Sequence, residues 1–227
     1  MNNLNKNKRL IIIGDSAFAQ IAYEYFQYDS DYEVIAFSVE RAFLKKTELF
    51  GIPIVEFETL QENFSPESHS IFVALTYHAF NRTRTRLYEE SKVKGYKIAT
   101  YISSRAFLWR NVEYGENCFI FENNTVQPFV KLGNNVILWS GNHIGHHSVI
   151  HDNCFISSHV VISGFCEIGA NAFIGVNAAL SNNLKIANDN FIGMGAVIIS
   201  DTEENQIYVG NPAKALKGNA SDMKFFK

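Results

Sequence analysis

The chain has 227 residues, 47% of them hydrophobic, which is enough for one large domain or two small ones. Its formal net charge is −3 and its pI is near 6.2, so it lacks the basic character of nucleic-acid-binding proteins. The apolar run at residues 10–13 is too short for a signal peptide or a membrane span. We therefore expect a cytoplasmic protein that neither binds nucleic acid nor inserts into membranes.

Strands and helices alternate in the first hundred residues. Strands are predicted at residues 10–14, 32–37, 52–55, 70–77 and 97–102, and helices at residues 16–28 and about 81–94. This alternation predicts a parallel sheet with crossover helices, which is a Rossmann-like α/β domain. We place the boundary near residue 104, giving one domain at 1–104 and a second at 105–227.

The second domain has a six-residue period. Every sixth residue from Leu108 to Ile198 is apolar, with Tyr114 as the one aromatic member of the series. Neither an α-helix nor an ordinary strand has this period, whereas a β-helix of hexapeptide repeats does. Three hexapeptides make one coil, so residues eighteen apart stack in columns with rungs roughly 4.8 Å apart. The period stops after Ser200, and residues 207–218 are expected to form a cap.

Small residues occupy fixed places in the repeat. Cys118, Cys154 and Cys166 each lie two positions before a member of the series, where most other residues are small, so we interpret them as core-filling residues. Glycines follow the series residue at several corners, where we expect unusual backbone angles. These glycines are Gly115, Gly133, Gly145, Gly169, Gly175 and Gly193.

Five of the seven histidines lie between His143 and His159, which first suggests a metal site. The register of the repeat argues against it, because it assigns His143, His146 and His151 to different positions on the coil. These side chains should point in different directions, and we predict no metal.

His146 is the candidate general base. The register stacks it one rung from Gly164, and a base beside an exposed glycine N–H is the arrangement that acyl transfer needs. The base takes a proton from the acceptor, and the N–H stabilises the developing oxyanion. A corner histidine hydrogen-bonded to the backbone is the alternative interpretation, and the register alone leaves both open.

The segments SGNHIGHHS (140–148), IGANAFIGVNA (168–178) and VGNPAKALKG (209–218), together with the repeat, resemble the left-handed β-helix acyltransferases. With its α/β domain, the whole chain resembles the bacterial nucleotide-sugar acetyltransferases of the sialic-acid O-acetyltransferase-like family. The resemblance implies a homotrimeric enzyme of surface-glycan synthesis that uses acetyl-CoA and no metal. It would acetylate the amino group of a UDP-, dTDP- or GDP-linked amino-deoxysugar by direct attack.

The resemblance also implies residue roles. His146 matches the family's catalytic base, and Gly164 matches the backbone donor to the thioester carbonyl. Coenzyme A would lie between neighbouring prisms, along Gly164, Asn182, Gly195, Ala196 and Lys214. Many members place an acid next to the base to orient it, but this chain has His147 there. The orienting role is therefore open to Asp152, Glu167 or a backbone group.

The N-terminal domain offers a candidate substrate site. Residues Gly14, Asp15 and Ser16 begin like a phosphate-binding strand–turn–helix, with helix capping as the alternative for the last two. The glycines of a full dinucleotide fingerprint are absent, so NAD binding is not expected. Further candidates follow later strands, where parallel sheets bind ligands. These are Glu40, Thr76 and Tyr77, with strand-end packing as the alternative for the last two.

Three other functions remain open from the sequence. The first is O-acetylation of a sugar such as sialic acid, and the second is transfer of a longer acyl group. A non-catalytic scaffold or ligand sensor is the third, although a pure scaffold has no need of GNHIGHHS (141–148) or the PAK segment (212–214).

Overall fold

The computed structural model describes residues 5–222, which form two compact units. The sheet unit contains the described part of residues 1–76 together with residues 83–101, and the prism contains residues 77–82 with the described part of 102–227. Residues 1–4 and 223–227 of the two predicted domains lie outside the described range. Among the described residues, no helix has the length and apolar character needed to cross a membrane.

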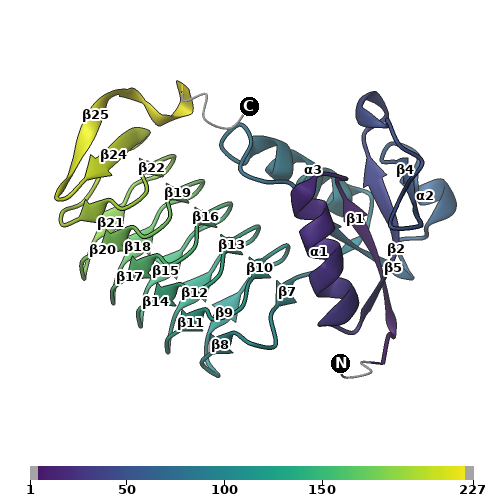
Figure 1. Cartoon of the computed structure of the whole chain (residues 1–227), viewed down its shortest axis with the longest axis horizontal. Helices are drawn as coiled ribbons and strands as arrows, with labels where there is room; N and C mark the ends of the chain where they lie inside the picture. The colour runs from purple at the N-terminus through teal and green to yellow at the C-terminus, as the bar shows by residue number, and fades with distance from the viewer. Residues whose placement is uncertain (1–4, 223–227) are drawn as a thin grey trace. The chain divides into compact units, whose positions relative to one another are not determined.

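The sheet unit is a Rossmann-like α/β fold, as predicted, with strand order β3-β4-β2-β1-β5-β6. All neighbouring strands run parallel except β3 and β4 (Figure 1). The strands are β1 (Lys8–Ile13), β2 (Tyr32–Val39), β3 (Glu48–Leu49), β4 (Ile52–Glu56), β5 (His69–Val73) and β6 (Lys97–Ile98). The helices are α1 (Ala17–Tyr28), η1 (Arg41–Phe43), α2 (Leu60–Asn63) and α3 (Arg82–Val93).

Strand β1 lies at the centre of this sheet, which explains its continuous apolar run. Residues Leu10 to Ile13 are at most 1% exposed. From β1 the chain builds the sheet outward through β2 and β4, then returns to add β5 and β6 on the other side. The direction in which strands are added therefore reverses next to β1. Parallel sheets bind ligands beside such a reversal, at the carboxyl ends of the strands.

Two predicted strands were too long. The strand expected at 70–77 ends at Val73, and the one expected at 97–102 is divided into β6 and β7 (Tyr101–Ile102). The first strand ends early because residues 77–82 leave the sheet unit and belong to the prism. Elements β3, η1 and α2 were not predicted because they are too short to show a period.

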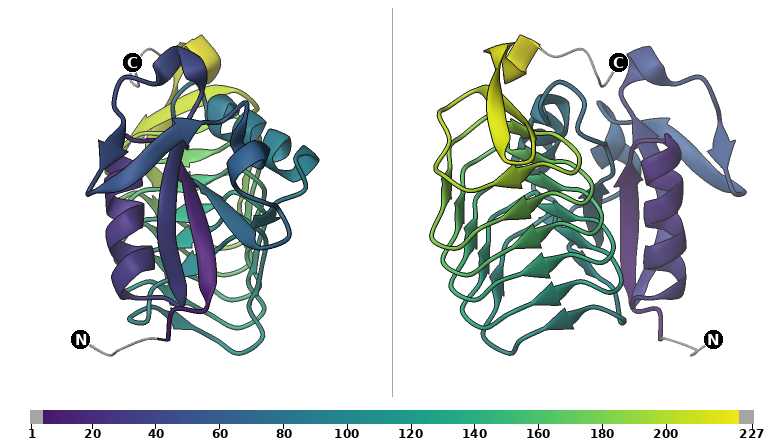
Figure 2. Two further views of the ribbon diagram at one scale, coloured as in Figure 1. Left: turned by 90° about the vertical axis from the view of Figure 1, so that its right-hand side faces the viewer. Right: turned by 60° about the vertical axis from the view of Figure 1, so that its left-hand side comes forward.

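The prism is a left-handed parallel β-helix, which confirms the predicted fold class. Its strands follow one another around three sheets, and Figure 2 shows the successive coils stacked above one another. One sheet, the C face, contains β7, β10 (Phe119–Ile120), β13 (Ile137–Leu138), β16 (Phe155–Ile156), β19 (Phe173–Ile174), β22 (Phe191–Ile192), β24 (Gln206–Gly210) and β25 (Ala213–Asn219). The D face contains β8 (Phe107–Leu108), β11 (Thr125–Val126), β14 (His143–Ile144), β17 (Val161–Ile162), β20 (Ala179–Leu180) and β23 (Val197–Ile198). The E face contains β9 (Glu113–Tyr114), β12 (Lys131–Leu132), β15 (Val149–Ile150), β18 (Glu167–Ile168) and β21 (Lys185–Ile186).

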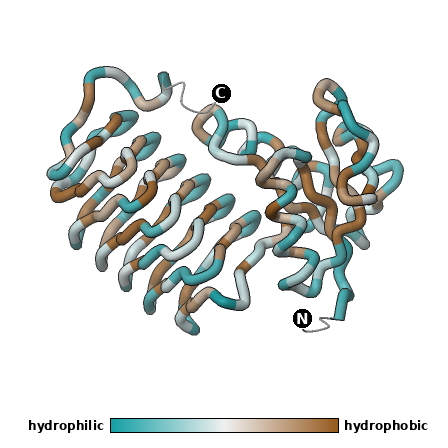
Figure 3. The backbone as a smooth tube through the Cα atoms, in the orientation of Figure 1, coloured by the Kyte–Doolittle hydropathy of each residue, from teal (hydrophilic) through white to brown (hydrophobic). Residues whose placement is uncertain are grey.

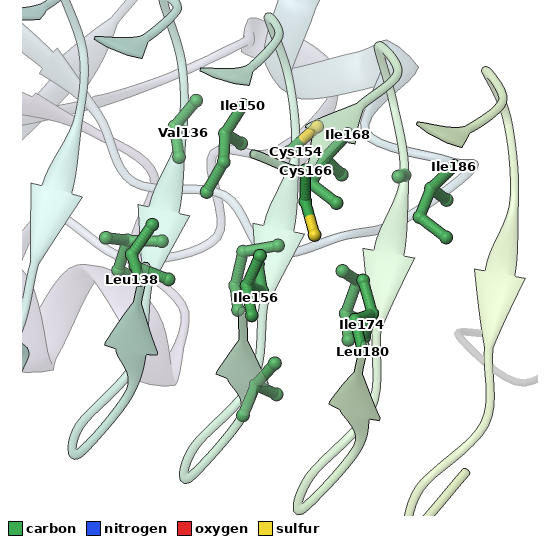
Figure 4. Packing of buried hydrophobic residues seen from close by; sticks show 14 of the residues in the cluster. Val136, Leu138, Ile150, Cys154, Ile156, Cys166, Ile168, Ile174, Leu180 and Ile186 are labelled. Atoms are coloured by element: carbon green, nitrogen blue, oxygen red, sulfur yellow. The ribbon is translucent and has the colours of Figure 1, made fainter. Parts of the chain in front are cut away.

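The apolar series forms the interior of the prism. Its members from Ile120 to Ile198 are buried, and the apolar positions recur on every coil in Figure 3. Figure 4 shows these side chains packed together between the coils, with the sulfur atoms of Cys154 and Cys166 among them. All three cysteines are free and buried, as predicted. Tyr114 is 50% exposed, so its assignment to the interior is wrong; it lies in the first strand of the E face.

The glycines after the series residues do not have the unusual backbone angles that we expected. None of the six has a positive φ, and the left-handed corners are mostly asparagines instead. A Cβ atom on Gly145 would lie 2.5 Å from the carbonyl carbon of Ser163, and one on Gly175 would lie 2.5 Å from the amide nitrogen of Met194. Glycine is needed here because the next coil passes too close for a side chain.

Residues 77–82 pack against the C face of the prism. The Tyr77 ring contacts Phe155 and Phe173, with centroids 5.8 and 5.0 Å away, and its hydroxyl donates to the carbonyl of Asn171. Arg82 forms an ion pair with Asp189 at 2.6 Å. After the last coil, β24 and β25 pair antiparallel at the end of the C face and η2 (Ala220–Asp222) follows.

Candidate active site at the His146 corner

The corner after β14 carries His146 directly above Gly164. The Gly145 N–H donates to the Ile162 carbonyl at 2.8 Å, and the Phe165 N–H donates to the His146 carbonyl at 2.9 Å. These bonds fix the two corners one coil apart, in the register that the six-residue period predicts. His146 is exposed, so its imidazole is accessible to a reactant.

The imidazole of His146 lies over the Cα of Gly164. A Cβ atom on Gly164 would be 2.9 Å from Cε1 and 3.0 Å from Nε2 of this ring. Any side chain at position 164 would therefore displace the imidazole or be displaced by it. Glycine keeps Nε2 close to the backbone of the next coil.

The backbone N–H of Gly164 is available as a donor. At the corresponding corners of Glu116, Asn134 and Ala170, the N–H donates to a side chain one coil later, at 2.9, 2.7 and 2.8 Å. The residue one coil after Gly164 is Asn182, yet no hydrogen bond from the Gly164 N–H is found within residues 5–222. A potential base and an open N–H thus lie side by side, which is the pairing required for acyl transfer.

His147 is a feature of this corner that the sequence analysis missed. Its Nδ1 lies 3.1 Å from Nδ1 of His146, and its ring is stacked between Phe129 and Phe165. The sequence did contain a signal, because residues 129, 147 and 165 are eighteen apart and all aromatic. The six-residue series marks the interior positions, whereas this column lies on the outside of the prism.

The two carboxylates proposed to orient His146 are engaged elsewhere. Asp152 Oδ1 accepts the Asn134 N–H at 2.7 Å. Glu167 pairs with His151 at 3.1 Å and with Lys185 at 3.6 Å, and the hydrogen bond from His151 contributes most to lowering the pKa of Glu167. A pocket on the E face is lined by this cluster and by none of the residues predicted to bind acetyl-CoA or the acceptor.

The histidines do not gather around a common centre. His151 lies on another corner with Glu167, and His159 lies beside Gly141, with Nδ1 2.6 Å from where a Cβ of that glycine would be. Within residues 5–222, no group of three or more His, Cys, Asp or Glu side chains has an arrangement that could hold a metal ion.

The residues predicted to contact coenzyme A differ in accessibility. Asn182, Gly195 and Lys214 are exposed, and Gly195 has a φ of 68° with open space around its Cα. Ala196 is fully buried; its N–H donates to Gly193 at 3.2 Å, and its carbonyl accepts from Ala179 at 2.9 Å.

In the sheet unit, the predicted phosphate loop lies where three strands end together. The Gly14 N–H donates to the Ser38 carbonyl at 2.7 Å, and the Ala74 N–H donates to the Ile13 carbonyl at 2.8 Å. Gly14 has a φ of 118°, and a Cβ there would lie 3.0 Å from the Ala74 carbonyl oxygen, so only glycine fits. The loop therefore passes across the carboxyl ends of β2, β1 and β5.

The other predicted substrate residues are distributed around the chain. Ser16 occupies the N-cap position of α1, but its side chain makes no capping hydrogen bond. Asp15 lies 4.0 Å from Lys46, and Glu40 forms an ion pair with Arg86 at 2.9 Å. Thr76 and Tyr77 lie beyond the end of β5. Thr76 is exposed, whereas the Tyr77 side chain is buried in the prism, and this burial raises its pKa.

The repeat matches the family model described as bacterial transferase hexapeptide (six repeats), at residues 130–164 and 147–182. The matched segments lie in the central coils of the prism. Both His146 and Gly164 lie inside the matched segments, and the predicted enzyme class, acyltransferase, is confirmed. No curated protein sequence matches the chain.

Several solved structures resemble this transferase over almost its whole length. The acetyltransferase domain of PglB from Neisseria gonorrhoeae is 25% identical with a TM-score of 0.83, covering 92% of this chain and all of that one. PerB from Caulobacter crescentus, in complex with CoA and GDP-perosamine, is 22% identical with a TM-score of 0.81, covering 91% and 96%. WeeI from Acinetobacter baumannii is 22% identical with a TM-score of 0.71, covering 92% and 100%.

Proposed function

We propose that this transferase moves the acetyl group of acetyl-CoA onto the amino group of a nucleotide-linked amino-deoxysugar. The observation that carries the proposal is the placement of His146 over Gly164, whose N–H has no partner within residues 5–222. In addition, the PglB domain has been solved with acetyl coenzyme A, and a variant of the Caulobacter protein is described as a perosamine N-acetyltransferase.

The chemistry requires one base and one oxyanion donor. The neutral amine attacks the thioester carbonyl carbon, and the developing oxyanion receives a hydrogen bond from the Gly164 N–H. His146 Nε2 takes the proton that the amine loses. When the carbon–sulfur bond breaks, the coenzyme A thiolate leaves and accepts that proton, so the products are the amide and free coenzyme A. The reaction uses no covalent enzyme intermediate.

We assign the coenzyme A site to the outer surface next to this corner. Gly164 and Asn182 are accessible there, Gly195 is exposed at the neighbouring corner between β22 and β23, and Lys214 on the cap offers a positive charge for a phosphate. We leave Ala196 out of the proposed site, because it is buried and both its backbone groups are bonded within the prism.

We assign the nucleotide to the loop at Gly14–Ser16 in the sheet unit. The N-terminus of α1 follows this loop, the Ser16 hydroxyl is free of a capping bond, and the strand order reverses beside it. Glu40 forms an ion pair with Arg86 at 2.9 Å, so a cation of the sheet unit already engages its carboxylate.

One of UDP-, dTDP- or GDP-linked sugars should stabilise the protein. At a hundred times its Kd, a ligand adds about 2.7 kcal/mol, which raises the Tm by roughly 5–10 °C for a chain of this size. Thermal-shift assays with the three nucleotide classes test this, with coenzyme A as the positive control. Ser16→Ala should keep the Tm of the free protein but reduce the nucleotide-dependent shift. If none of the three raises the Tm, the nucleotide-sugar assignment is wrong.

The narrower resemblance to the sialic-acid O-acetyltransferase-like family stays a prediction, as do O-acetylation, a longer acyl donor and a cytoplasmic location. We favour N-acetylation because the Caulobacter structures contain an amino sugar linked to GDP. The scaffold alternative does not account for a glycine whose Cβ would clash with the exposed imidazole above it.

We propose a homotrimer formed through the D face. Outward residues of the E face form ion pairs, Lys131 with Glu113 and Lys185 with Glu167, and part of the C face is covered by residues 77–82. The D face instead exposes Phe107, Val161 and Ile199, which are 54%, 45% and 61% exposed. An exposed apolar face of this kind fits a second copy of the same chain.

Val161→Glu should dissociate the trimer, because it places a carboxylate in the apolar row of the D face. Sedimentation velocity measures the result, with the wild type as the trimeric reference. Val149→Glu is the matched control, since Val149 is the outward residue of the E face beside Lys131. A monomeric wild type, or equal behaviour of both variants, would contradict this assembly.

A further inference from the structure

We propose that His147 is a positioning residue that holds His146 in the tautomer needed for catalysis. The proposal rests on the function proposed above, in which His146 is the base. The role concerns a hydrogen bond between two imidazoles rather than the usual bond between an imidazole and a carboxylate or carbonyl.

The geometry allows one proton between the two rings. Nδ1 of His146 and Nδ1 of His147 are 3.1 Å apart, so one nitrogen donates and the other accepts. If His146 donates, its own proton is on Nδ1 and its Nε2 carries a free lone pair. Of the two ring nitrogens, Nε2 lies nearer to the Cβ position of Gly164, at 3.0 Å against 3.3 Å for Nδ1, and a base must present a lone pair there. His147 then carries its proton on Nε2.

No other side chain within residues 5–222 is hydrogen-bonded to the imidazole of His146. Its backbone N–H donates to Gln127 Oε1 at 3.0 Å, which fixes the corner but leaves the ring free. Phe165 meets the ring edge-on with centroids 5.0 Å apart, which offers no acceptor for the Nδ1 proton. His147 is thus the group that selects the tautomer.

The position of His147 is itself fixed by stacking. Its ring lies 4.6 Å from that of Phe129 at 27° and 4.8 Å from that of Phe165 at 16°. Sandwiched in this way, the imidazole cannot rotate away from His146 without losing both contacts. Phe129 and Phe165 therefore hold the His147 ring in place beside His146.

This column also occupies strained backbone. Phe129, His147 and Phe165 have φ values of 65°, 60° and 59°, in the left-handed region that costs a bulky residue about 1–3 kcal/mol. The corresponding corners elsewhere in the prism are mostly asparagine, which tolerates this region. Strain that persists in three aromatic residues on one column, next to a candidate base, indicates a functional constraint.

Two substitutions separate the hydrogen bond from the stacking. His147→Phe keeps an aromatic ring between Phe129 and Phe165 but has no acceptor for the Nδ1 proton. His147→Asn loses the stack but keeps an acceptor oxygen and suits the left-handed corner. We expect the Phe variant to lower kcat about 10–100-fold with KM for acetyl-CoA unchanged, and the Asn variant to keep kcat within about threefold of the wild type.

A purely structural role predicts the opposite order, since the Phe variant would then be active and the Asn variant destabilised. Equal kcat for His147→Phe and wild type, or equal losses in both variants, would overturn the proposal. Melting temperatures of both variants show whether a loss of activity reflects folding.

The tautomer can be measured without turnover. Nitrogen-15 NMR of the histidine rings should show His146 protonated on Nδ1 and bare on Nε2 in the wild type, and a changed tautomer population in His147→Phe. A wild-type His146 protonated on Nε2 would overturn the proposal. This readout does not depend on the acceptor, so an inactive wild type with the expected spectrum would contradict the proposed function and leave the positioning role standing.

Discussion

His146→Ala should lower kcat by a factor on the order of 10²–10⁴, the range that general acid–base catalysis supplies. The KM for acetyl-CoA should hardly change, because the proposed role is proton transfer and not binding. Since His146 is exposed, we expect the free energy of unfolding to stay within about 0.5 kcal/mol of the wild type. Steady-state kinetics with a nucleotide-linked amino sugar and acetyl-CoA measure the first two values, and denaturant titration measures the third.

His151→Ala is the matched control for this substitution. His151 is also an exposed corner histidine, but it pairs with Glu167 on a different corner and lies outside the candidate site. Its loss should leave kcat unchanged. If His146→Ala retains near-normal turnover, His146 is not the base, and the alternative interpretation of a structural corner residue is correct.

The six-residue period predicted the prism accurately because each hexapeptide repeats the same physical environment. Two residues per hexapeptide point inward, the series residue and the residue two positions before it, and at the series place the interior tolerates only apolar side chains. Because one coil contains eighteen residues, this series also places Gly164 one coil after His146. The sequence could therefore predict which residues at the candidate site are neighbours.

The period could not predict why particular residues occupy the corners. Gly145 and Asn153 are both corner residues, yet the glycine is required by the approach of the next coil and the asparagine by a φ of 64°. Both requirements depend on three-dimensional contacts. For the same reason, the orienting role was left open to Asp152, Glu167 or a backbone group, while the side chain hydrogen-bonded to the His146 ring is His147.

The sheet unit was predicted less well beyond its central strands. Tyr77 follows a strongly apolar strand and has the pattern of a strand end, but it is buried against the aromatic column of the C face. A run of apolar residues in the sequence does not show which hydrophobic surface each of them packs against. Predictions of ligand contacts at strand ends share this weakness, because the same residues suit packing and binding.

The second large effect is expected at Gly164. Gly164→Pro removes the N–H that we assign to the oxyanion, which should lower kcat by about 10²–10³. Proline is compatible with this corner, because Pro128 occupies the same column two coils earlier, and the Pro128 carbonyl accepts the His147 N–H at 3.1 Å. The Gly164 carbonyl, which accepts from Asn183 at 3.0 Å, is retained in the variant.

Gly164→Ala tests the two roles of this glycine separately, because it keeps the N–H donor but fills the space beside the His146 ring. Its Cβ would press on the imidazole as the proline Cβ does, 2.9 Å from Cε1 before any adjustment, but its N–H remains. We therefore expect the alanine variant to lose part of its activity and the proline variant to lose far more, because only the proline variant also lacks the N–H. Equal kcat in the two variants would show that Gly164 is not the oxyanion donor and that glycine is needed here only to leave space for the imidazole. The two variants share the inserted Cβ, so the additional loss in the proline variant reports the missing N–H together with the ring Cδ that takes its place.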